Sequence, residues 1–380
     1  MHARRMLFLA EGNAETWDSL SGASRSALHA IRRAGWDARS SDVNVYGTRD
    51  WLVRLLSVRA SRRHWAQHYH TGPIGFAWRS HRARAAARSH PAGAPILQVG
   101  ATFLADTGQH PLFTYCDANS AMASRGGQWA AVARLSSGEL DAVLAREREV
   151  YHACAGVFTF TEGLRRSMID DFGVPPERVV TTYAGPNLAF FPADTDLDAP
   201  KADAPTILFI GRKWERKGGP TVVEAFARVR QAVPQARLLL AGCNPPLTAM
   251  PGIEIVGFVR RDDPGPRGLK ALFLASDVFC MPSHYEPFGA VFSEAMVHGV
   301  ACVGPRRYMS EIIVDGETGW LVEAGQAEEL AEVLIRALSD RERLRAMGRA
   351  GRGRAMHLFN WDRVADRLLT AIESALPPGA

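Results

Sequence analysis

Two segments in the second half of the chain carry charged side chains that could bind an anion. The first, residues 210–219, reads IGRKWERKGG, so an apolar run is followed by a loop with four basic residues and two glycines. Arginine offers phosphate oxygens a planar fork of donors, and lysine offers a compact charge. The free N–H groups of a helix that begins at Gly218-Gly219 would add further donors. The segment predicts a diphosphate site, although by itself it would better suit a solvated basic loop.

The second segment, residues 282–296, places two glutamates around a predicted helix start. It reads PSHYEPFGAVFSEAM, with Glu286 in the loop after an apolar run and Glu294 about two helical turns further on. Ionised carboxylates only accept hydrogen bonds, so they suit a ligand with hydroxyls at two places and an anion between them. A nucleotide-diphosphate sugar has that layout. The spacing of the glutamates is weak evidence alone, but it becomes strong beside the Glu-Pro-Phe-Gly run and the basic loop.

Short apolar runs alternate with amphipathic stretches, the pattern of parallel sheets covered by helices. The first half predicts strands at 6–10, 96–99, 112–115, 157–161 and 179–183, and helices at 24–34, 139–153 and 162–172. The second half predicts strands at 206–210, 237–241, 253–256, 277–281 and 300–303, and helices at 219–232, 289–298 and 327–338. Both charged segments therefore follow predicted strands, where ligands of such sheets bind.

A linker rich in Pro and Asp, residues 189–205, divides this pattern in two. A chain of 380 residues also exceeds the size of one hydrophobic core. We predict an α/β protein with two facing Rossmann-like domains, each a doubly wound parallel sheet, at 1–188 and 206–360. The active site is expected in the cleft between them. A final helix, about 361–380, is expected to pack back onto the first domain.

Composition favours an ordinary globular enzyme, with 47% apolar and 22% charged residues. No apolar run approaches the roughly 20 residues that cross a bilayer. The apolar run at 6–10 stops at Glu11 and is too short for a signal peptide, so a cytoplasmic location is expected. The five cysteines are odd in number and never spaced as Cys-x-x-Cys. This argues against a disulfide framework or a zinc site.

The basic residues are distributed unevenly. Residues 1–187 hold 22 Arg, no Lys and 16 acidic residues, a balance of +6, whereas the remainder balances at −1. The excess is densest from Arg49 to Arg88, where nine arginines and several aromatic residues accompany one acid, Asp50. Such a stretch could dock on an anionic membrane or on an anionic acceptor, although by itself it would better suit a solvated arginine-rich face. No recognised nucleic-acid motif accompanies the charge, so nucleic acid is not expected as a partner.

With these motifs in place, the second half resembles glycosyltransferase family 4, whose members are retaining enzymes with the GT-B fold. The resemblance covers the GRKWERKGG loop, the two-glutamate segment, the DGETGW turn at 315–320 and the FNWD run at 359–362. In the first half it continues through EREVYHACAGVFTFTEGLRRSMIDDFGVPPERV, which is similar to the last βαβ segment of the family's N-terminal domain.

The resemblance implies a role for each matching residue. Arg212 and Lys217 would neutralise the donor diphosphate, Glu286 would hold hydroxyls of the transferred sugar, and Glu294 would hold the ribose. The remaining donor-binding positions are Gly22, Gly211, Val259, Arg260, Phe288, Gly289 and Ala290. One position departs from the family pattern: Asp117 stands where the family commonly has a His after the N-domain strand that faces the donor sugar. An Asp there could hold a sugar hydroxyl or orient the acceptor.

The expected activity is transfer of a sugar from a UDP- or GDP-linked donor to a hydroxyl acceptor, a glycan, a lipid-linked sugar or a small molecule. The resemblance implies a front-face mechanism that retains the anomeric configuration, without a metal or other cofactor. A non-catalytic nucleotide-sugar-binding or regulatory protein on the same fold stays open as the alternative. A dehydrogenase is disfavoured because no Gly-x-Gly-x-x-Gly follows the first strand.

Two other patterns resemble metal sites. The sequence Asp194-Thr195-Asp196 spells the Asp-x-Asp of another glycosyltransferase fold, but it lies in the linker and follows no convincing buried strand. His64 and His68 have the i, i+4 spacing of a zinc helix, yet Trp65 stands where a zinc protease needs its glutamate. We therefore expect no metal at either place.

Overall fold

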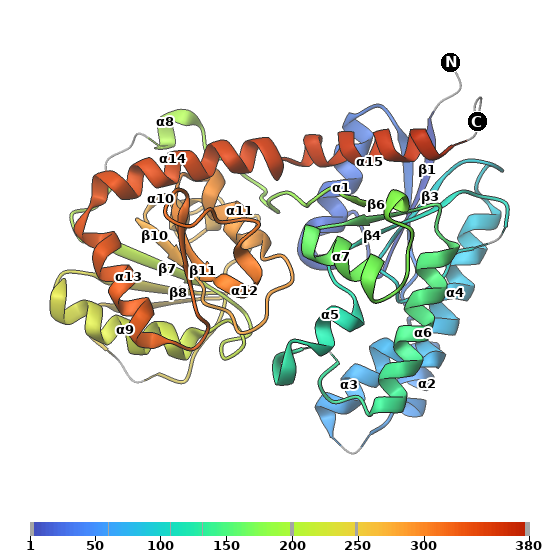
Figure 1. Ribbon diagram of the computed structural model, residues 1–380, viewed down its shortest axis with the longest axis horizontal. Helices are drawn as coiled ribbons and strands as arrows, with labels where there is room; N and C mark the ends of the chain where they lie inside the picture. The colour runs from blue at the N-terminus through green and yellow to red at the C-terminus, as the bar shows by residue number, and fades with distance from the viewer. Residues whose placement is uncertain are drawn as a thin grey trace. The chain divides into compact units, whose positions relative to one another are not determined.

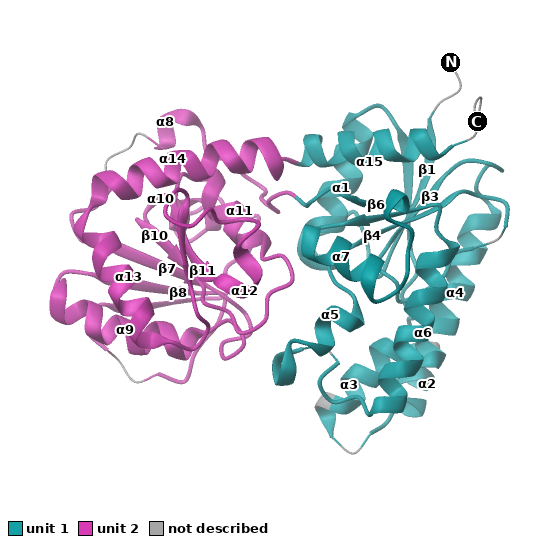
Figure 2. Ribbon diagram, viewed as in Figure 1, with its two compact units in different colours: residues 1–184, 361–380 teal, residues 185–360 magenta. Residues whose placement is uncertain are grey.

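The computed structural model describes residues 4–59, 61–106, 108–130, 132–197, 201–247 and 250–376. Parts of four sequence predictions lie outside these residues: the chain start, Ala60 within 49–88, residues 198–200 of the linker, and the last four residues of the final helix. The chain forms two compact units (Figure 2). Unit 1 comprises residues 1–184 and 361–380, and unit 2 comprises residues 185–360.

Unit 1 is built on a six-stranded parallel sheet with the order β2-β1-β3-β4-β5-β6 (Figure 1). Its strands are β1 Arg5–Ala10, β2 Asp37–Asp42, β3 Ile96–Val99, β4 Leu112–Cys116, β5 Gly156–Thr159 and β6 Val179–Thr181. The central strands are apolar and buried because helices cover both faces of the sheet. β2 was not predicted, since its sequence DARSSD is polar and it lies at the sheet edge. The strand order reverses between β1 and β3, which makes their carboxyl ends a site where ligands commonly bind.

Helices account for most of the remaining residues of unit 1. They are α1 Ala23–Arg33, α2 Thr48–Leu56, α3 Arg62–Thr71, α4 Pro73–Arg88, α5 Ser120–Ser124, α6 Ser137–Ala153, α7 Glu162–Asp170 and α15 Trp361–Ala375. The sequence predicted α1, α6 and α7 but missed α2, α3 and α4. α15 packs along α1 and is held there by an ion pair from Arg33 Nη2 to Asp362 Oδ1 of 2.6 Å.

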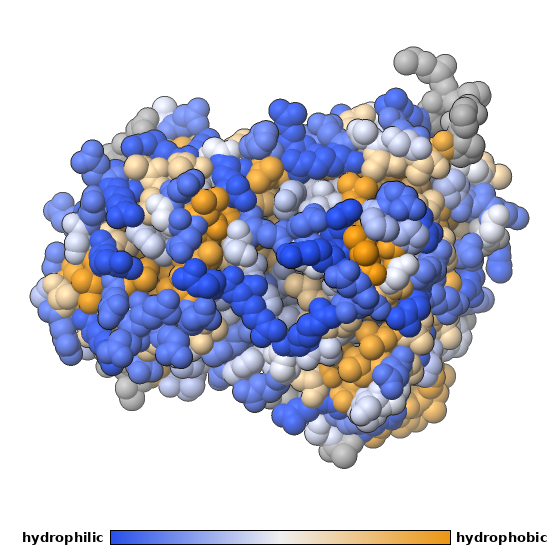
Figure 3. Space-filling view, in the orientation of Figure 1, coloured by the Kyte–Doolittle hydropathy of each residue, from blue (hydrophilic) through white to orange (hydrophobic). Residues whose placement is uncertain are grey.

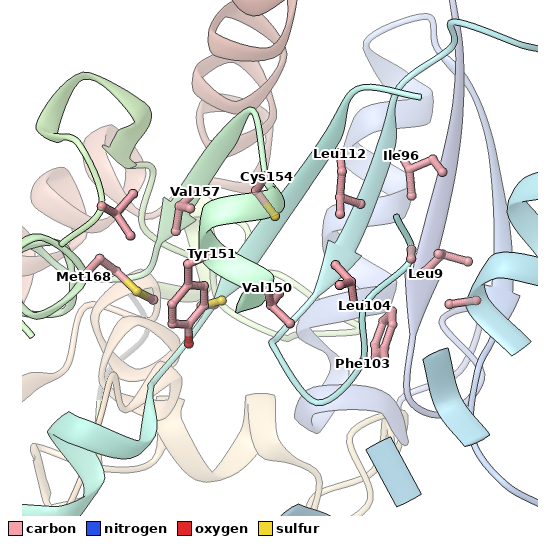
Figure 4. Packing of buried hydrophobic residues seen from close by; sticks show 14 of the residues in the cluster. Leu9, Ile96, Phe103, Leu104, Leu112, Val150, Tyr151, Cys154, Val157 and Met168 are labelled. Carbon is pink, nitrogen blue, oxygen red and sulfur yellow. The ribbon is translucent and has the colours of Figure 1, made fainter. Parts of the chain in front are cut away.

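The core of unit 1 lies between this sheet and the helices α6 and α7 (Figure 4). Leu9, Ile96 and Val157 come from three different strands and are buried in one cluster with Val150 and Met168. Burial of each such side chain stabilises the fold by about 1.5–3 kcal/mol. Four of the five cysteines are also buried, and all five are free, as the sequence predicts.

Unit 2 has a second six-stranded parallel sheet, with the order β12-β11-β10-β7-β8-β9. Its strands are β7 Thr206–Ile210, β8 Arg237–Ala241, β9 Ile253–Gly257, β10 Val278–Cys280, β11 Ala301–Pro305 and β12 Gly319–Val322. Numbered within the unit, the order is 3-2-1-4-5-6, that of dinucleotide-binding Rossmann domains. The order reverses between β7 and β10, so the loops after these two strands flank the position where such a sheet binds its ligand.

The helices of unit 2 agree closely with the sequence where it made a prediction. They are α8 Asp194–Leu197, α9 Gly219–Ala232, α10 Leu269–Leu274, α11 Ala290–Val297, α12 Arg306–Met309, α13 Ala327–Ser339 and α14 Arg341–Leu358. α9, α11 and α13 were predicted to within one residue at each end, and α14 was missed. Within the described residues, none of the helices combines the length and the apolar character that crossing a bilayer requires.

Candidate functional site

Hydrogen bonds join the loop that follows β7 to the loop that follows β10. Arg216 Nη1 donates to Tyr285 O at 2.6 Å, and His284 N donates to Arg216 O at 2.9 Å. Gly218 has a φ of +79°, and a Cβ there would lie 2.4 Å from Pro282 O, so only glycine allows the two backbones to approach this closely. The basic loop and the first glutamate of the two-glutamate segment are thus brought together at the reversal point of the sheet.

Lys217 and Glu286 form an ion pair at this point. Both side chains are largely buried, with exposed fractions of 14% and 8%. Burial lowers the pKa of Lys217, and the neighbouring Glu286 opposes that effect. Ser283 Oγ lies 3.5 Å from the same carboxylate oxygen, Glu286 Oε2. A desolvated ammonium held in one place acts on a bound anion far more strongly than a lysine free in water.

Two helix N-termini begin beside this pair. α9 follows Gly218 and α11 follows Gly289, and neither helix has a side-chain cap hydrogen bond at its N-terminus. Gly289 has a φ of +71°, and a Cβ there would lie 3.0 Å from Glu286 Cγ. Uncapped N–H groups and the positive end of the helix dipole favour an anion. Phe288, which is buried, and Ala290, which is partly buried, flank the start of α11, as predicted from the sequence.

Glu294 lies inside α11 and is almost fully buried, with 1% of the residue exposed. Its Oε1 accepts from Arg261 Nη1 at 2.7 Å and from Asn187 N at 3.2 Å. Arg261 Nη1 also donates to Asn187 O at 2.6 Å. The carboxylate predicted to hold a ribose therefore has a cationic partner within the chain. The sequence analysis missed Arg261 and named its neighbour Arg260, whose side chain is 72% exposed and pairs with Asp262.

The remaining predicted donor residues surround the same edge of the sheet. Arg212 is exposed, and its guanidinium stacks over the ring of Phe258 at 5.2 Å from the centroid. Val259 follows Phe258 in the loop after β9 and is partly buried. Gly211 is buried and donates its N–H to Ala241 O at 2.9 Å. The basic loop therefore contacts the loop after β9 through Arg212 and the loop after β10 through Arg216 and Lys217.

His298 lies one helical turn after Glu294, and it makes the stability of unit 2 depend on pH. Its Nδ1 lies 2.7 Å from Glu294 O, its ring stacks on Phe273, and its buried Nε2 has no hydrogen-bond partner among the described residues. Burial lowers its pKa to about 4. Between pH 6.5 and pH 4, His298 is protonated in the unfolded chain but neutral in the folded chain. The free energy of unfolding should therefore fall by about 3 kcal/mol over that range because of this residue.

Urea unfolding at a series of pH values tests this prediction. The variant His298→Gln should show a shallower loss of stability from pH 6.5 to pH 4 than the unmodified chain, because the carboxylates that titrate there are common to both proteins. Parallel curves for the two proteins would contradict the assignment.

The side chains of the two patterns that resembled metal sites form ion pairs and hydrogen bonds within the protein. Asp194 Oδ1 pairs with Arg352 Nη2 and Asp196 Oδ2 pairs with Lys270 Nζ, each at 2.8 Å. His64 Nε2 lies 3.0 Å from Glu139 Oε2. Among the described residues no group of three or more His, Cys, Asp or Glu is arranged to hold a metal ion.

The model of the family "Glycosyl transferases group 1" matches residues 204–340, which contain both charged loops. Relatives named as glycosyltransferases match the chain as well, and the two comparisons support the resemblance to glycosyltransferase family 4.

Curated relatives match parts of the chain. A D-inositol 3-phosphate glycosyltransferase of Segniliparus rotundus is 33% identical over 184 residues, 46% of this chain and 41% of the relative. A GDP-mannose-dependent alpha-(1-6)-phosphatidylinositol monomannoside mannosyltransferase of Mycobacterium tuberculosis is 29% identical over 184 residues, 44% of this chain and 46% of the relative. The matches thus span about half the length of the curated relatives.

The solved structures cover nearly the whole chain. Sucrose-phosphate synthase from Thermosynechococcus elongatus matches with a TM-score of 0.70 at 19% identity, over 98% of each chain. Anabaena HepE in complex with UDP-glucose matches with a TM-score of 0.64 at 16% identity, over 97% of this chain and 99% of that one. These likenesses show the fold, which is the GT-B combination of two Rossmann-like units that the sequence predicts.

Unit 1 contains the other two predicted residues, Gly22 and Asp117. Gly22 has a φ of +93° and precedes α1, which has no side-chain cap. Leu20 and Ser21 before it also have positive φ, at +46° and +54°. These residues lead into the uncapped N-terminus of α1, whose free N–H groups and helix dipole favour an anion.

Asp117 directly follows β4 and is partly buried. Its loop is fixed from two sides. Glu147 of α6 accepts from Ser120 N at 2.9 Å and from Ser120 Oγ at 2.8 Å, and Asn119 Nδ2 donates to Ser167 Oγ of α7 at 2.9 Å. Burial raises the pKa of Glu147 to about 7. The loop that presents Asp117 is therefore held rigidly by buried polar contacts.

Glu11 is a further candidate ligand-binding residue of unit 1, which the sequence alone did not indicate. It follows β1 at the reversal point of the unit 1 sheet, and Thr102, from the loop after β3, donates its hydroxyl to the Glu11 carboxylate. The guanidinium of Arg79, almost fully buried, lies 3.6 Å from the other carboxylate oxygen. The only sequence signal was a charged residue at the abrupt end of the first apolar run.

Proposed function

We propose that the protein is a retaining glycosyltransferase that moves a sugar from a nucleotide-diphosphate donor to a hydroxyl acceptor. The observation that carries the proposal is the buried Lys217–Glu286 pair between the uncapped starts of α9 and α11. The match to the family over residues 204–340 and the fold shared with a UDP-glucose-bound protein support it. We assign donor binding to unit 2 and acceptor binding to unit 1.

In the proposed reaction the bond between the sugar C1 and the diphosphate oxygen stretches, and negative charge grows on the departing diphosphate. Lys217, Arg212 and the N–H groups that begin α9 and α11 stabilise that charge. Glu286 has two functions, because its carboxylate fixes the Lys217 ammonium and accepts from hydroxyls of the transferred sugar. The acceptor oxygen forms its bond to C1 on the same face that the diphosphate leaves, and the leaving phosphate takes the acceptor proton. This front-face substitution retains the configuration without a carboxylate nucleophile.

The remaining residues position the two substrates. Glu294 has one carboxylate oxygen bound by Arg261, and we propose that its other oxygen accepts from a ribose hydroxyl. Val259, Arg260 and the exposed ring of Phe258 would border the base, which is uracil or guanine. Asp117 would bind a sugar hydroxyl or orient the acceptor. Since charge on the diphosphate is met by side chains and helix ends, we propose that no metal or other cofactor is required.

A ligand screen followed by a turnover assay tests this function. UDP or GDP, but not ADP, should raise the thermal midpoint, because a ligand present at 100 times its Kd adds about 2.7 kcal/mol of stability. The matching sugar nucleotide should then be hydrolysed slowly without an acceptor and equally well in excess EDTA, with release of the α-anomer from an α-linked donor in the proton NMR spectrum.

Each result separates the alternatives. Binding of a nucleotide sugar with neither hydrolysis nor transfer would favour the non-catalytic binding protein on the same fold. Release of the inverted anomer would overturn the retaining mechanism, and loss of turnover in EDTA would overturn metal independence.

We also propose that the protein acts in the cytoplasm and contacts an anionic membrane surface through residues 49–88. The strongly basic balance of residues 1–187 supports this placement.

A further inference from the structure

Unit 1 carries a concentrated set of exposed apolar side chains. Among the described residues, eleven large apolar side chains are exposed, and six of these lie between residues 46 and 58. They are Tyr46, Trp51, Leu52, Leu55, Leu56 and Val58, with exposed fractions from 46% to 62%. Figure 3 shows apolar surface gathered in the region where Figure 1 labels α2. So large a concentration on one short segment marks an interaction surface.

The four helical members of this set share one side of α2. Trp51 and Leu55, and likewise Leu52 and Leu56, are four residues apart, so together they span roughly 140° of the helix circumference. We call these four residues the α2 apolar face. Among the described residues this face is left exposed, whereas the opposite side of α2 is packed: Val53 is fully buried in a cluster with Val45 and Tyr69.

Polar contacts on the packed side fix the orientation of α2. Arg54 Nε donates to Asp50 Oδ2 at 2.7 Å, Tyr69 donates its hydroxyl to the same carboxylate group, and Trp65 Nε1 donates to Arg54 O at 2.8 Å. These bonds join α2 to α3. The apolar face therefore points outward because of how α2 is attached, and it cannot turn inward without breaking this set of bonds.

The charge around the α2 apolar face indicates what covers it. Residues 46–71 contain five arginines and one acidic residue, Asp50. Two acids of other elements lie close to these residues: Glu139 pairs with Arg59, from Nε to Oε1 at 3.2 Å, and with His64, and Asp42 accepts from the Tyr46 hydroxyl. A second copy of the chain would place the same positive charges opposite each other across a symmetric interface. An anionic bilayer instead supplies opposite charge around an apolar interior.

We propose that the α2 apolar face inserts into the headgroup and upper acyl region of a bilayer containing anionic phospholipid. Leu52, Leu55 and Leu56 lie among the acyl chains, Trp51 lies at the headgroup boundary, and Arg62, which is exposed, contacts a lipid phosphate. This changes the sequence-based expectation, which placed the contact along the whole arginine-rich stretch. The interaction does not depend on the sugar donor, so it fails or holds separately from the proposed function.

Co-sedimentation of the full chain with vesicles tests the proposal. The unmodified chain should bind vesicles of phosphatidylcholine with about one quarter phosphatidylglycerol, and bind pure phosphatidylcholine much more weakly, with binding reduced at high salt. The double variant Leu52→Ser, Leu55→Ser should lower the vesicle partition coefficient by about tenfold or more. Arg62→Gln, a change at an exposed residue, should lower it about fivefold on anionic vesicles only.

A matched control removes exposed apolar side chains from unit 2. The double variant Ile255→Ser, Met356→Ser should bind vesicles like the unmodified chain. Circular dichroism and the thermal shift with nucleotide should be unchanged in the Leu52, Leu55 variant, because Val53 and its contacts remain. Equal binding of that variant and the unmodified chain, or binding indifferent to anionic lipid, would overturn the proposal. So would a dimer in light scattering that the same variant dissociates, since a second copy would then cover the face.

Discussion

Replacing Lys217 by Ala is expected to lower kcat by about 10²-fold or more, the loss typical of removing one donor that stabilises charge in a transition state. The reason lies in the environment of Lys217. Its ammonium is desolvated, fixed by Glu286 and placed between two uncapped helix starts, so it needs no rearrangement when the diphosphate departs. The measurement is steady-state turnover of the nucleotide sugar that the ligand screen identifies.

The control for Lys217 lies in the same loop. Lys213 is exposed, and Lys213→Ala makes the same change in side chain and charge four residues away. Its kcat should stay within about threefold of the unmodified value, as expected for an exposed charge screened by water and salt. Comparable losses in the two variants would mean that only the overall charge of the loop matters, and near-normal turnover in Lys217→Ala would overturn the assignment.

Loss of Lys217 also leaves Glu286 buried without its cation, which is destabilising by itself. The double variant Lys217→Met, Glu286→Gln removes both charges while keeping similar volumes. We expect its thermal midpoint to recover toward the unmodified value and its turnover to stay low. Recovery of both properties together would show that the Lys217 effect was one of folding and not of catalysis.

The sequence predicts the fold well where strands are buried on both sides. β3, β4 and β7 consist mostly of apolar residues, and each was located to within one residue. β2 was not predicted because an edge strand needs no apolar run and its residues are mostly polar. α2 was also missed, although its apolar residues at 51, 52, 55 and 56 have the i, i+4 spacing of an amphipathic helix.

The candidate site was predictable in kind but not in its pairings. Residue types in the two loops indicated an anion and hydroxyls, yet Lys217 and Glu286 are 69 residues apart, and only the strand order brings them together. For the same reason the sequence could not indicate which of two adjacent arginines reaches Glu294. Arg260 and Arg261 are chemically identical, and the path of the loop after β9 alone turns one outward and the other inward.

The different environments of Arg260 and Arg261 predict a second large effect, on the stability of the protein. Arg261→Gln removes the cation that pairs with Glu294, whose side chain is 2% exposed, and also removes the donor to Asn187 O. A buried carboxylate left unpaired costs several kcal/mol, reduced here because the Arg261 side chain is 27% exposed and water can reach part of the site. We expect the free energy of unfolding to fall by about 3 kcal/mol, measured by urea unfolding.

Arg260→Gln is the matched comparison, because it makes the identical change one residue earlier. Its pair with Asp262 is largely exposed, and such pairs contribute about 0–1 kcal/mol, so its stability should hardly change. Equal losses in the two variants would contradict the inward placement of Arg261. If Glu294→Gln is added to Arg261→Gln, the double variant should be more stable than Arg261→Gln alone, because a neutral amide is cheaper to bury than an unpaired carboxylate. If stability is restored, any remaining loss of nucleotide binding would measure the contribution of the Arg261–Glu294 pair.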